Sequence, residues 1–205
     1  MSTMRDRTVF ITGASRGIGR AIALAAARQG ANVVIAAKSD TPHPKLPGTI
    51  HTVAEEVRDA GGKALPLVLD VRDEKQIRQR IDEAGEHFGG IDALVNNAGA
   101  IRLTGVENLK VSRSPPLNLN TRWFAQYGPY TTTKYAMTML SLGMAEEFRR
   151  YGIAVNTLWP KTLIATAAIE FEVGGPQMMA QGRKPDGRTV SPTSSITGMS
   201  RAISP

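Results

Sequence analysis

The sequence has no cysteine and only three histidines. Without cysteine, the chain forms neither a disulfide nor a thiolate metal site, which is compatible with a reducing compartment. The histidines at 43, 51 and 87 lack the spacing of metal ligands, so we predict no metal site. Aromatic residues make up 5% of the 205 residues and hydrophobic residues 41%, as is typical of a soluble globular protein packed mainly by Ala, Val, Ile and Leu.

Long apolar runs are also missing. A membrane-spanning helix needs about 18 consecutive apolar residues, and no run approaches that length. The charged residues 1–7 lead into an apolar run that is too short for the core of a signal peptide. We therefore expect a cytoplasmic protein without a membrane span.

Positive charge predominates, with 25 Lys and Arg residues against 18 Asp and Glu residues and a net charge of +7. Such a charge favours polyanionic partners. The basic residues are scattered, however, and concentrate only modestly after Gln181. We therefore expect no nucleic-acid partner, although a basic interaction protein that acts through this tail stays open as an alternative.

Short apolar runs alternate with segments of helical periodicity over the first half of the chain. Strands and helices that alternate at this spacing imply parallel strands joined by right-handed crossovers. We predict an α/β fold with a doubly wound parallel sheet of the Rossmann type. The predicted strands are 8–12, 31–37, 64–69 and 91–95, and the helices between them run from 18 to about 30, over 52–60 and over 73–88.

The second half has fewer signals. Its apolar pattern predicts a long helix over 130–150 and a further strand over 153–158. The residues after Gln181 are rich in Ser, Thr, Gly, Pro and Arg and have no apolar period. We therefore expect a single Rossmann-type domain over 1–182 and an irregular or disordered tail over 183–205.

A glycine-rich turn lies between the first predicted strand and the first predicted helix. Glycines there allow a pyrophosphate to approach the backbone, and the helix N-terminus offers unpaired N–H groups with a partial positive charge. Strand, turn and helix occur in the order that gives such a motif its meaning. The turn therefore predicts a dinucleotide site, whose candidate residues here are Gly13, Ser15, Arg16, Gly17, Ile18 and Gly19.

The spacing Gly-x-x-x-Gly-x-Gly after Thr12 resembles the short-chain dehydrogenase/reductase family. Four further matches follow in the family's order: Asp70-Val71, Asn96-Asn97-Ala98-Gly99, Tyr130-x-x-x-Lys134, and Asn156 with Pro160. The resemblance covers about residues 7–100 and 112–184. Within the family, the stretches 42–46, 114–120 and 158–162 resemble the hydroxysteroid dehydrogenase-like branch.

The resemblance implies an NAD(P)-dependent oxidoreductase that interconverts a carbonyl and a secondary alcohol by hydride transfer. It assigns catalysis to Ser114, Tyr130 and Lys134, and the branch suggests a small, lipid-like substrate. Cofactor contacts are implied for the glycine-rich turn and for Lys38, Asp70, Val71, Asn97, Ala98, Gly99, Tyr130, Lys134, Pro160 and Thr162.

Tyr130 and Lys134 are four residues apart on a predicted helix, so their side chains share one face. Lowering the pKa of a tyrosine from about 10 to ~7 requires about 4 kcal/mol. One charge at ~4 Å in an effective dielectric near 20 supplies roughly that much. Lys134 and the oxidised nicotinamide are the candidate charges, and Tyr130 would then serve as general acid or base.

The residues after the second predicted strand bear on the choice of cofactor. An acidic residue there would bond the ribose hydroxyls of NAD, whereas Lys38, helped by Arg16, suits the 2′-phosphate of NADP. We expect NADP. NAD stays an alternative because Asp40 lies only two residues further on.

The chain is short between Asn97 and Ser114, where only residues 98–113 intervene. A helix that crosses the sheet needs about eleven residues and the next strand about five, plus loops. We therefore expect the crossover helix after the fourth strand to be missing, together with the family's catalytic asparagine. A catalytically impaired, nucleotide-binding remnant is thus the alternative function, and any homo-oligomer is expected to be weakened.

Overall fold

The computed structural model describes residues 4–99, 121–158, 160, 164–167, 169, 175, 182, 183 and 185. The chain divides into two compact units, each described here by itself. One comprises Met1–Ala100, Ile164–Ala167 and Arg183–Val190, and the other Ile101–Leu163, Ala168–Gly182 and Ser191–Pro205. The expected single domain over 1–182 stays a prediction.

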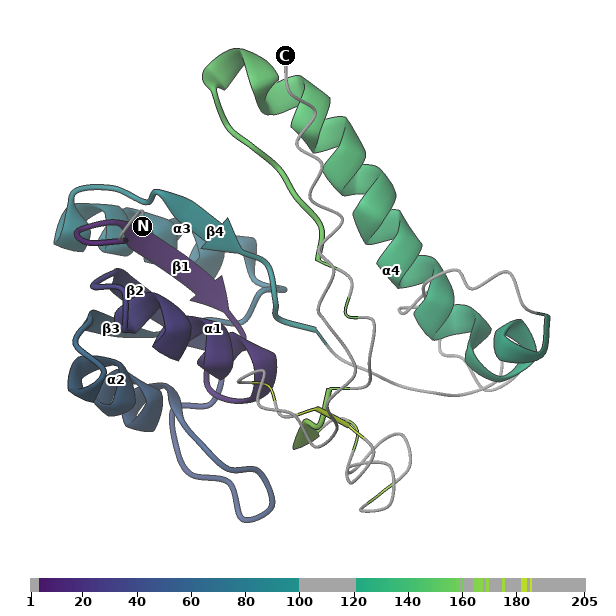
Figure 1. The fold of residues 1–205 in the computed structure, drawn as a ribbon, viewed down its shortest axis with the longest axis horizontal. Helices are drawn as coiled ribbons and strands as arrows, with labels where there is room; N and C mark the ends of the chain where they lie inside the picture. The colour runs from purple at the N-terminus through teal and green to yellow at the C-terminus, as the bar shows by residue number, and fades with distance from the viewer. Residues whose placement is uncertain are drawn as a thin grey trace. The chain divides into compact units, whose positions relative to one another are not determined.

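The first unit is a parallel sheet flanked by helices, as predicted (Figure 1). Its strand order is β3-β2-β1-β4, and every pairing is parallel. This arrangement confirms the doubly wound α/β fold. The elements are β1 (Thr8–Thr12), α1 (Gly17–Ala27), β2 (Asn32–Ala37), α2 (Ile50–Asp59), β3 (Lys63–Val68), α3 (Glu74–Phe88) and β4 (Ala93–Val95).

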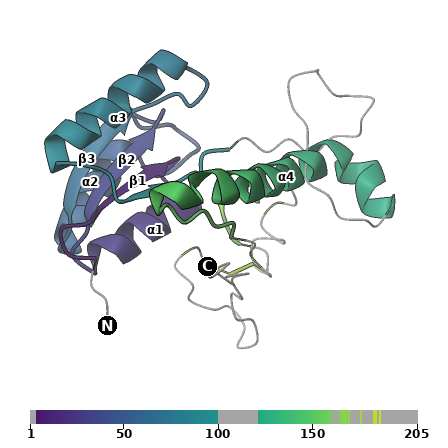
Figure 2. The same cartoon turned by 90° about the horizontal axis from the view of Figure 1, so that it is seen from above.

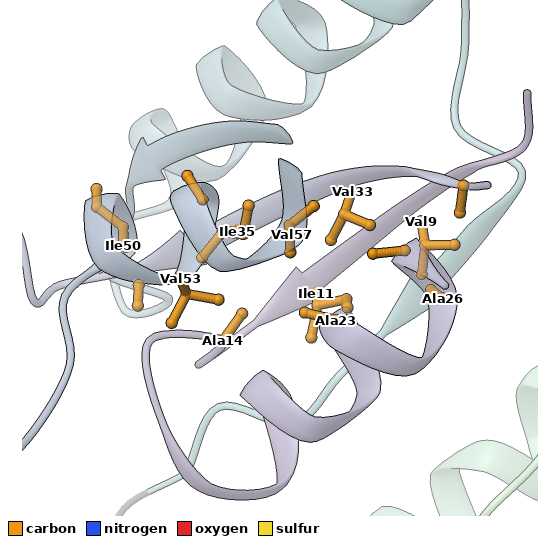
Figure 3. Packing of buried hydrophobic residues seen from close by; sticks show 14 residues of the cluster. Val9, Ile11, Ala14, Ala23, Ala26, Val33, Ile35, Ile50, Val53 and Val57 are labelled. Atoms are coloured by element: carbon orange, nitrogen blue, oxygen red, sulfur yellow. The ribbon is translucent and has the colours of Figure 1, made fainter. Parts of the chain in front are cut away.

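Both faces of the central strands are covered, which explains why β1 and β2 are continuous buried runs rather than alternating ones. On one face, the strands pack against the small residues of α1 and the valines of α2 (Figure 3). On the other face, Phe10, Val34 and Ala36 pack with residues of α3. Figure 2 shows α1 and α3 on opposite sides of the sheet.

Side-chain caps begin two of the helices. Thr49 and Thr52 form a reciprocal capping box at the start of α2. Asp73, the predicted cap of α3, accepts the backbone N–H groups of Lys75 and Gln76. The Asp73 cap was predicted from the sequence, whereas α2 was located by the spacing of its valines and by the glycines that follow it.

The second unit contains α4 (Thr121–Phe148) and the short 3₁₀ helix η2 (Arg149–Tyr151). The predicted helix over 130–150 is confirmed but starts too late, since α4 continues through a kink at Tyr127 and includes Pro129. Proline removes a backbone donor and disrupts the preceding turn, which explains the kink.

The strand predicted over 153–158 is wrong. These residues form no strand in the structure, and Ile153 and Leu158 are 52% and 60% exposed. An apolar run becomes a strand only where a neighbouring strand pairs with it. The segment expected to lack the crossover helix, residues 100–120, and most of the tail lie outside the described residues. Among the described helices, none is both long and apolar enough to span a bilayer.

Candidate dinucleotide-binding site

The glycine-rich turn leaves the carboxyl end of β1 and leads into α1. The backbone N–H of Gly13 donates to the Ala36 carbonyl oxygen at 2.7 Å, which ties the turn to the end of β2. Arg16 is the N-cap residue of α1, and its side chain makes no capping bond. The N-cap side chain thus does not occupy the first N–H groups of the helix, which is compatible with the predicted anion site.

Asn97 closes the turn from the other side. Its side-chain amide donates to the carbonyl oxygens of Thr12 and Gly13 at 2.9 and 3.1 Å. The Thr12 hydroxyl accepts the backbone N–H groups of Asn97 and Ala98, each at 3.0 Å, and donates to the Val95 carbonyl oxygen. The structure thus brings the turn together with predicted contact residues 97 and 98 at the carboxyl ends of β1 and β4.

We call residues 12–19 together with Asn97 the nucleotide cradle. Glycine is required at two of its positions. A Cβ built on Gly19 would lie 2.5 Å from the Gly13 carbonyl oxygen and 2.6 Å from Asn97 Nδ2. A Cβ on Gly13 would lie 2.9 Å from the Ala98 Cα and from Asn97 Nδ2. The turn, the start of α1 and Asn97 therefore approach one another with no room for side chains, which is the close packing that a dinucleotide-binding turn requires.

A group of polar and charged side chains lies at the end of β2. The Arg16 guanidinium donates through Nη2 to the Ser39 hydroxyl at 2.7 Å, and partial burial lowers the pKa of Arg16. Lys38 is 61% exposed and its ammonium lies 3.7 Å from the Asp70 carboxylate. Asp40, the residue that kept NAD open, has its carboxylate 2.7 Å from His51 Nε2.

Asp70 follows β3, as the sequence predicted, and its carboxylate is held by Arg72. The Arg72 Nε and Nη2 atoms donate to it at 2.6–3.1 Å. These hydrogen bonds, supported by the nearby charge of Lys38, hold the pKa of Asp70 well below its usual range. Val71 is 43% exposed beside it, and no metal-binding cluster occurs among the described residues.

Tyr130 and Lys134 are on α4, one helical turn apart, in the second unit. Both side chains are partly buried. Burial raises the pKa of the Tyr130 phenol and lowers the pKa of the Lys134 ammonium. The direction for the pKa of Tyr130 is opposite to the lowering that its predicted role as a general base would need, so that role would depend on the charges of Lys134 and of an oxidised nicotinamide.

The structure describes only one of the three remaining predicted site residues, Ser114, Pro160 and Thr162. Ser114 and Thr162 lie outside the described residues. Pro160 is described and is exposed, in the second unit. Thr12 and Ser39 were not predicted as site residues, although they directly adjoin two residues that were, Gly13 and Lys38 respectively.

Comparison with known proteins agrees with this geometry. A family model described as short chain dehydrogenase matches residues 7–114. Hydroxysteroid dehydrogenase-like protein 2 of Danio rerio is 54% identical over 211 residues, covering 86% of this chain and 50% of that protein. The chain spans about half the length of the curated relatives it matches. The resemblance to the hydroxysteroid dehydrogenase-like branch is thereby confirmed.

Solved structures of dehydrogenases are also similar to this chain. A short chain dehydrogenase from Mycobacterium thermoresistibile superimposes with a TM-score of 0.79 at 43% identity, covering 90% of this chain and 78% of that one. A putative dehydrogenase from Xanthomonas campestris gives a TM-score of 0.82 at 42% identity, covering 90% and 80%.

Proposed function

Because this chain belongs to the short-chain dehydrogenase family, we propose that it interconverts a carbonyl compound and a secondary alcohol with a nicotinamide dinucleotide. The observation that carries the proposal is the close packing of the nucleotide cradle at Gly13, Gly19 and Asn97. Proteins that share the fold include a carveol dehydrogenase from Mycobacterium avium in complex with NAD and a Burkholderia cenocepacia dehydrogenase in complex with NADP. The fold therefore accommodates either cofactor.

In the proposed complex, the glycine-rich turn and the start of α1 hold the pyrophosphate through backbone N–H groups. Asp70 and Val71 border the adenine, and residues 97–99 line the path towards the nicotinamide. Pro160 and Thr162 complete the nicotinamide side in this assignment.

A bound nicotinamide supplies the hydride donor or acceptor. In reduction, the neutral Tyr130 phenol donates its Oη proton to the substrate oxygen, and in oxidation the phenolate takes that proton back. Ser114 donates a hydrogen bond to the same oxygen, and the Lys134 ammonium stabilises the phenolate. Burial favours the neutral phenol, so the protonated, reduction-competent form of Tyr130 predominates at neutral pH.

NADP is the proposed cofactor. Arg16 and Lys38 place two cations beside the residue that ends β2, where the 2′-phosphate of NADP would lie. The Asp40 carboxylate contacts His51 and the Lys38 ammonium contacts Asp70, so the proposal of NADP rests mainly on Arg16. The proposed substrate is a small, lipid-like carbonyl or alcohol, on the strength of the branch resemblance.

The test has two measurements. Fluorescence titration is expected to show tighter binding of NADPH than of NADH. Turnover is then followed by NADPH absorbance with aliphatic ketones, aldehydes and secondary alcohols of increasing chain length. Tyr130→Phe is expected to lower turnover by about 10²–10⁴-fold, because general acid–base catalysis is worth about that much, while NADPH still binds through the glycine-rich turn. Tyr135→Phe, the same change on the same helix, is the control.

The outcomes separate the alternatives. NADPH binding without turnover on any compound would support the impaired remnant. A chain that binds neither NADPH nor NADH would contradict the proposal. Equal turnover in Tyr130→Phe and the unaltered chain would remove Tyr130 from catalysis.

A further inference from the structure

The loop of residues 39–48, between β2 and α2 (Figure 1), is fastened at its base. The backbone N–H of Ile50 donates to the Ser39 carbonyl oxygen at 2.9 Å. The carboxylate of Asp40 meets His51 Nε2 at 2.7 Å. The first two residues of the loop are thereby joined to the start of α2, into which its last residues lead.

The tip of the loop is also ordered by its own bonds. His43 and Leu46 form an antiparallel bridge. The ring of His43 accepts the backbone N–H of Lys45 at 3.1 Å through Nδ1. Prolines restrict the backbone further because each fixes one dihedral angle, and they stand at positions 42, 44 and 47. The loop thus has a defined shape although its sequence shows no helix or strand periodicity.

Arg16 joins this loop to the glycine-rich turn. Its Nε–H donates to the Pro47 carbonyl oxygen at 3.1 Å, and its Nη2 atom donates to the Ser39 hydroxyl and to the Gly48 carbonyl oxygen at 2.7 and 3.2 Å. These bonds use three of the five guanidinium hydrogens. Among the described residues, no acceptor is bonded to Nη1, so its two N–H groups are left for an anion.

Gly48 brings the loop against the turn itself. It has φ +84°, and a Cβ built on it would overlap the Ser15 carbonyl oxygen. Loop and turn are therefore in direct backbone contact at a residue that has to be glycine. Gly61 has a similar φ of +95° with no atom within 4 Å of its Cβ position, so it provides a matched control for backbone strain.

We propose that the 39–48 loop is a positioning element that holds the Arg16 guanidinium in place for the 2′-phosphate of NADP and thereby sets the cofactor preference. The inference rests on the proposed function and adds to it the residues that orient Arg16. A long arginine side chain loses rotamer freedom when it binds a phosphate. Three loop acceptors restrict the side chain in advance, so less freedom is lost on binding.

The experiment compares the binding of two nucleotides, of which only one carries a 2′-phosphate. Calorimetry gives the dissociation constants of 2′,5′-ADP and 5′-AMP for each variant of the full chain. Ser39→Ala removes one Arg16 acceptor, Ser39→Thr keeps it, and Gly48→Ala pushes the loop off the turn. Ser39→Ala and Gly48→Ala are expected to weaken 2′,5′-ADP by about tenfold, as the loss of one charge-assisted bond does. The dissociation constant of 5′-AMP is expected to change less than about twofold.

Two controls distinguish positioning from general stability. Gly61→Ala strains the backbone equally but is expected to leave both dissociation constants unchanged, and Ser39→Thr is expected to restore the preference for 2′,5′-ADP. Should Gly48→Ala fail to fold, the Ser39 pair carries the test alone, because it leaves the backbone intact.

The inference is overturned if Ser39→Ala and Gly48→Ala keep the preference of the unaltered chain while Arg16→Ala loses it. The proposed function would survive that result, since NADPH would still bind. An unaltered chain that binds neither NADPH nor NADH would overturn both, so the two failures are distinguishable.

Discussion

Thr12 and Asn97 bond each other reciprocally across the ends of two adjacent strands. The Thr12 hydroxyl accepts the Asn97 backbone N–H at 3.0 Å, and the Asn97 side chain donates back to the Thr12 carbonyl oxygen at 2.9 Å. The two residues are 85 positions apart in the sequence. The shape of the glycine-rich turn therefore depends on a residue that follows β4. A substitution of either residue should disturb the backbone at both.

Replacing Thr12 with valine tests this relationship. Thr12→Val keeps the volume but removes the hydroxyl, so the backbone N–H of Ala98 loses its acceptor and the backbone N–H of Asn97 keeps only the Val95 carbonyl oxygen. The residues that carry these N–H groups are partly buried, so the loss is expected near the lower end of the about 1–3 kcal/mol that an unsatisfied buried donor costs. Urea unfolding is expected to show a loss of that size, with weaker NADPH binding. Thr12→Ser, which keeps the hydroxyl, should stay closer to the unaltered chain; an equal loss in both would point to packing instead.

Replacing two helical glycines with alanine, one at a time, is expected to change the stability of the fold in opposite directions. Gly19→Ala places a Cβ against Gly13 and Asn97, and such overpacking costs about 1–3 kcal/mol. Gly85→Ala, in α3, has no atom within 4 Å of the new Cβ, so it should stabilise by up to about 1 kcal/mol through helix propensity. Thermal unfolding checks the signs, and NADPH titration should detect the effect of Gly19→Ala alone. A tolerated Gly19→Ala would contradict the close approach described above.

Asp92 makes stability depend on acid pH. Its carboxylate accepts the Thr8 backbone N–H at 2.8 Å and pairs with Arg7, and these bonds lower the pKa of Asp92. A carboxylate whose pKa is lower in the folded than in the unfolded chain stabilises the fold at pH values above its ordinary pKa of about 4. This contribution is lost as the pH falls through the lowered pKa of the folded state. The urea midpoint should therefore drop between pH 6 and pH 3.

Asp92→Asn should show a smaller drop over the same range, because the substituted side chain has no charge to lose. Asp59→Asn, at an exposed position that ends α2, controls for the removal of a carboxylate. An unchanged pH dependence in Asp92→Asn would assign the acid sensitivity to other groups.

An exposed leucine on β4 is expected to promote association. Leu94 is 54% exposed, stands opposite Phe10 in the sheet, and belongs to a strand that pairs only with β1 among the described residues. Exposed apolar area on a sheet face favours self-association. Sedimentation velocity at micromolar concentration should show a larger monomer fraction for Leu94→Ser than for the unaltered chain. Equal monomer fractions in both would show that Leu94 does not drive the association.

The sequence predicted the first unit well because its signals are local. Apolar runs, helical spacing and the Asp73 cap lie within single elements, so each can be recognised without knowledge of its neighbours. The glycine-rich turn was recognisable for the same reason. The bounds of β1 were predicted to the residue, and β4 was predicted too long only at its start.

What depends on distant partners was harder to predict. The run over 153–158 has the composition of a strand, but composition does not show whether a partner strand is present. The bonds from Arg16 to the 39–48 loop end largely on backbone carbonyls, which every residue has and no sequence pattern reveals. The pKa of Tyr130 was similarly out of reach, since burial of a half-apolar helix face shows only in three dimensions.

The position of β1 in the middle of the sheet has a consequence for synthesis on the ribosome. β2 and β3 leave the ribosome soon after β1 and can pair in order, whereas β4 follows only after a further helix has been made. Contacts between distant segments form late because their closure costs the most chain entropy. Among the four strands of the sheet and the turns that they carry, we therefore expect the nucleotide cradle to form last in the nascent chain, when Asn97 bonds the Thr12 hydroxyl.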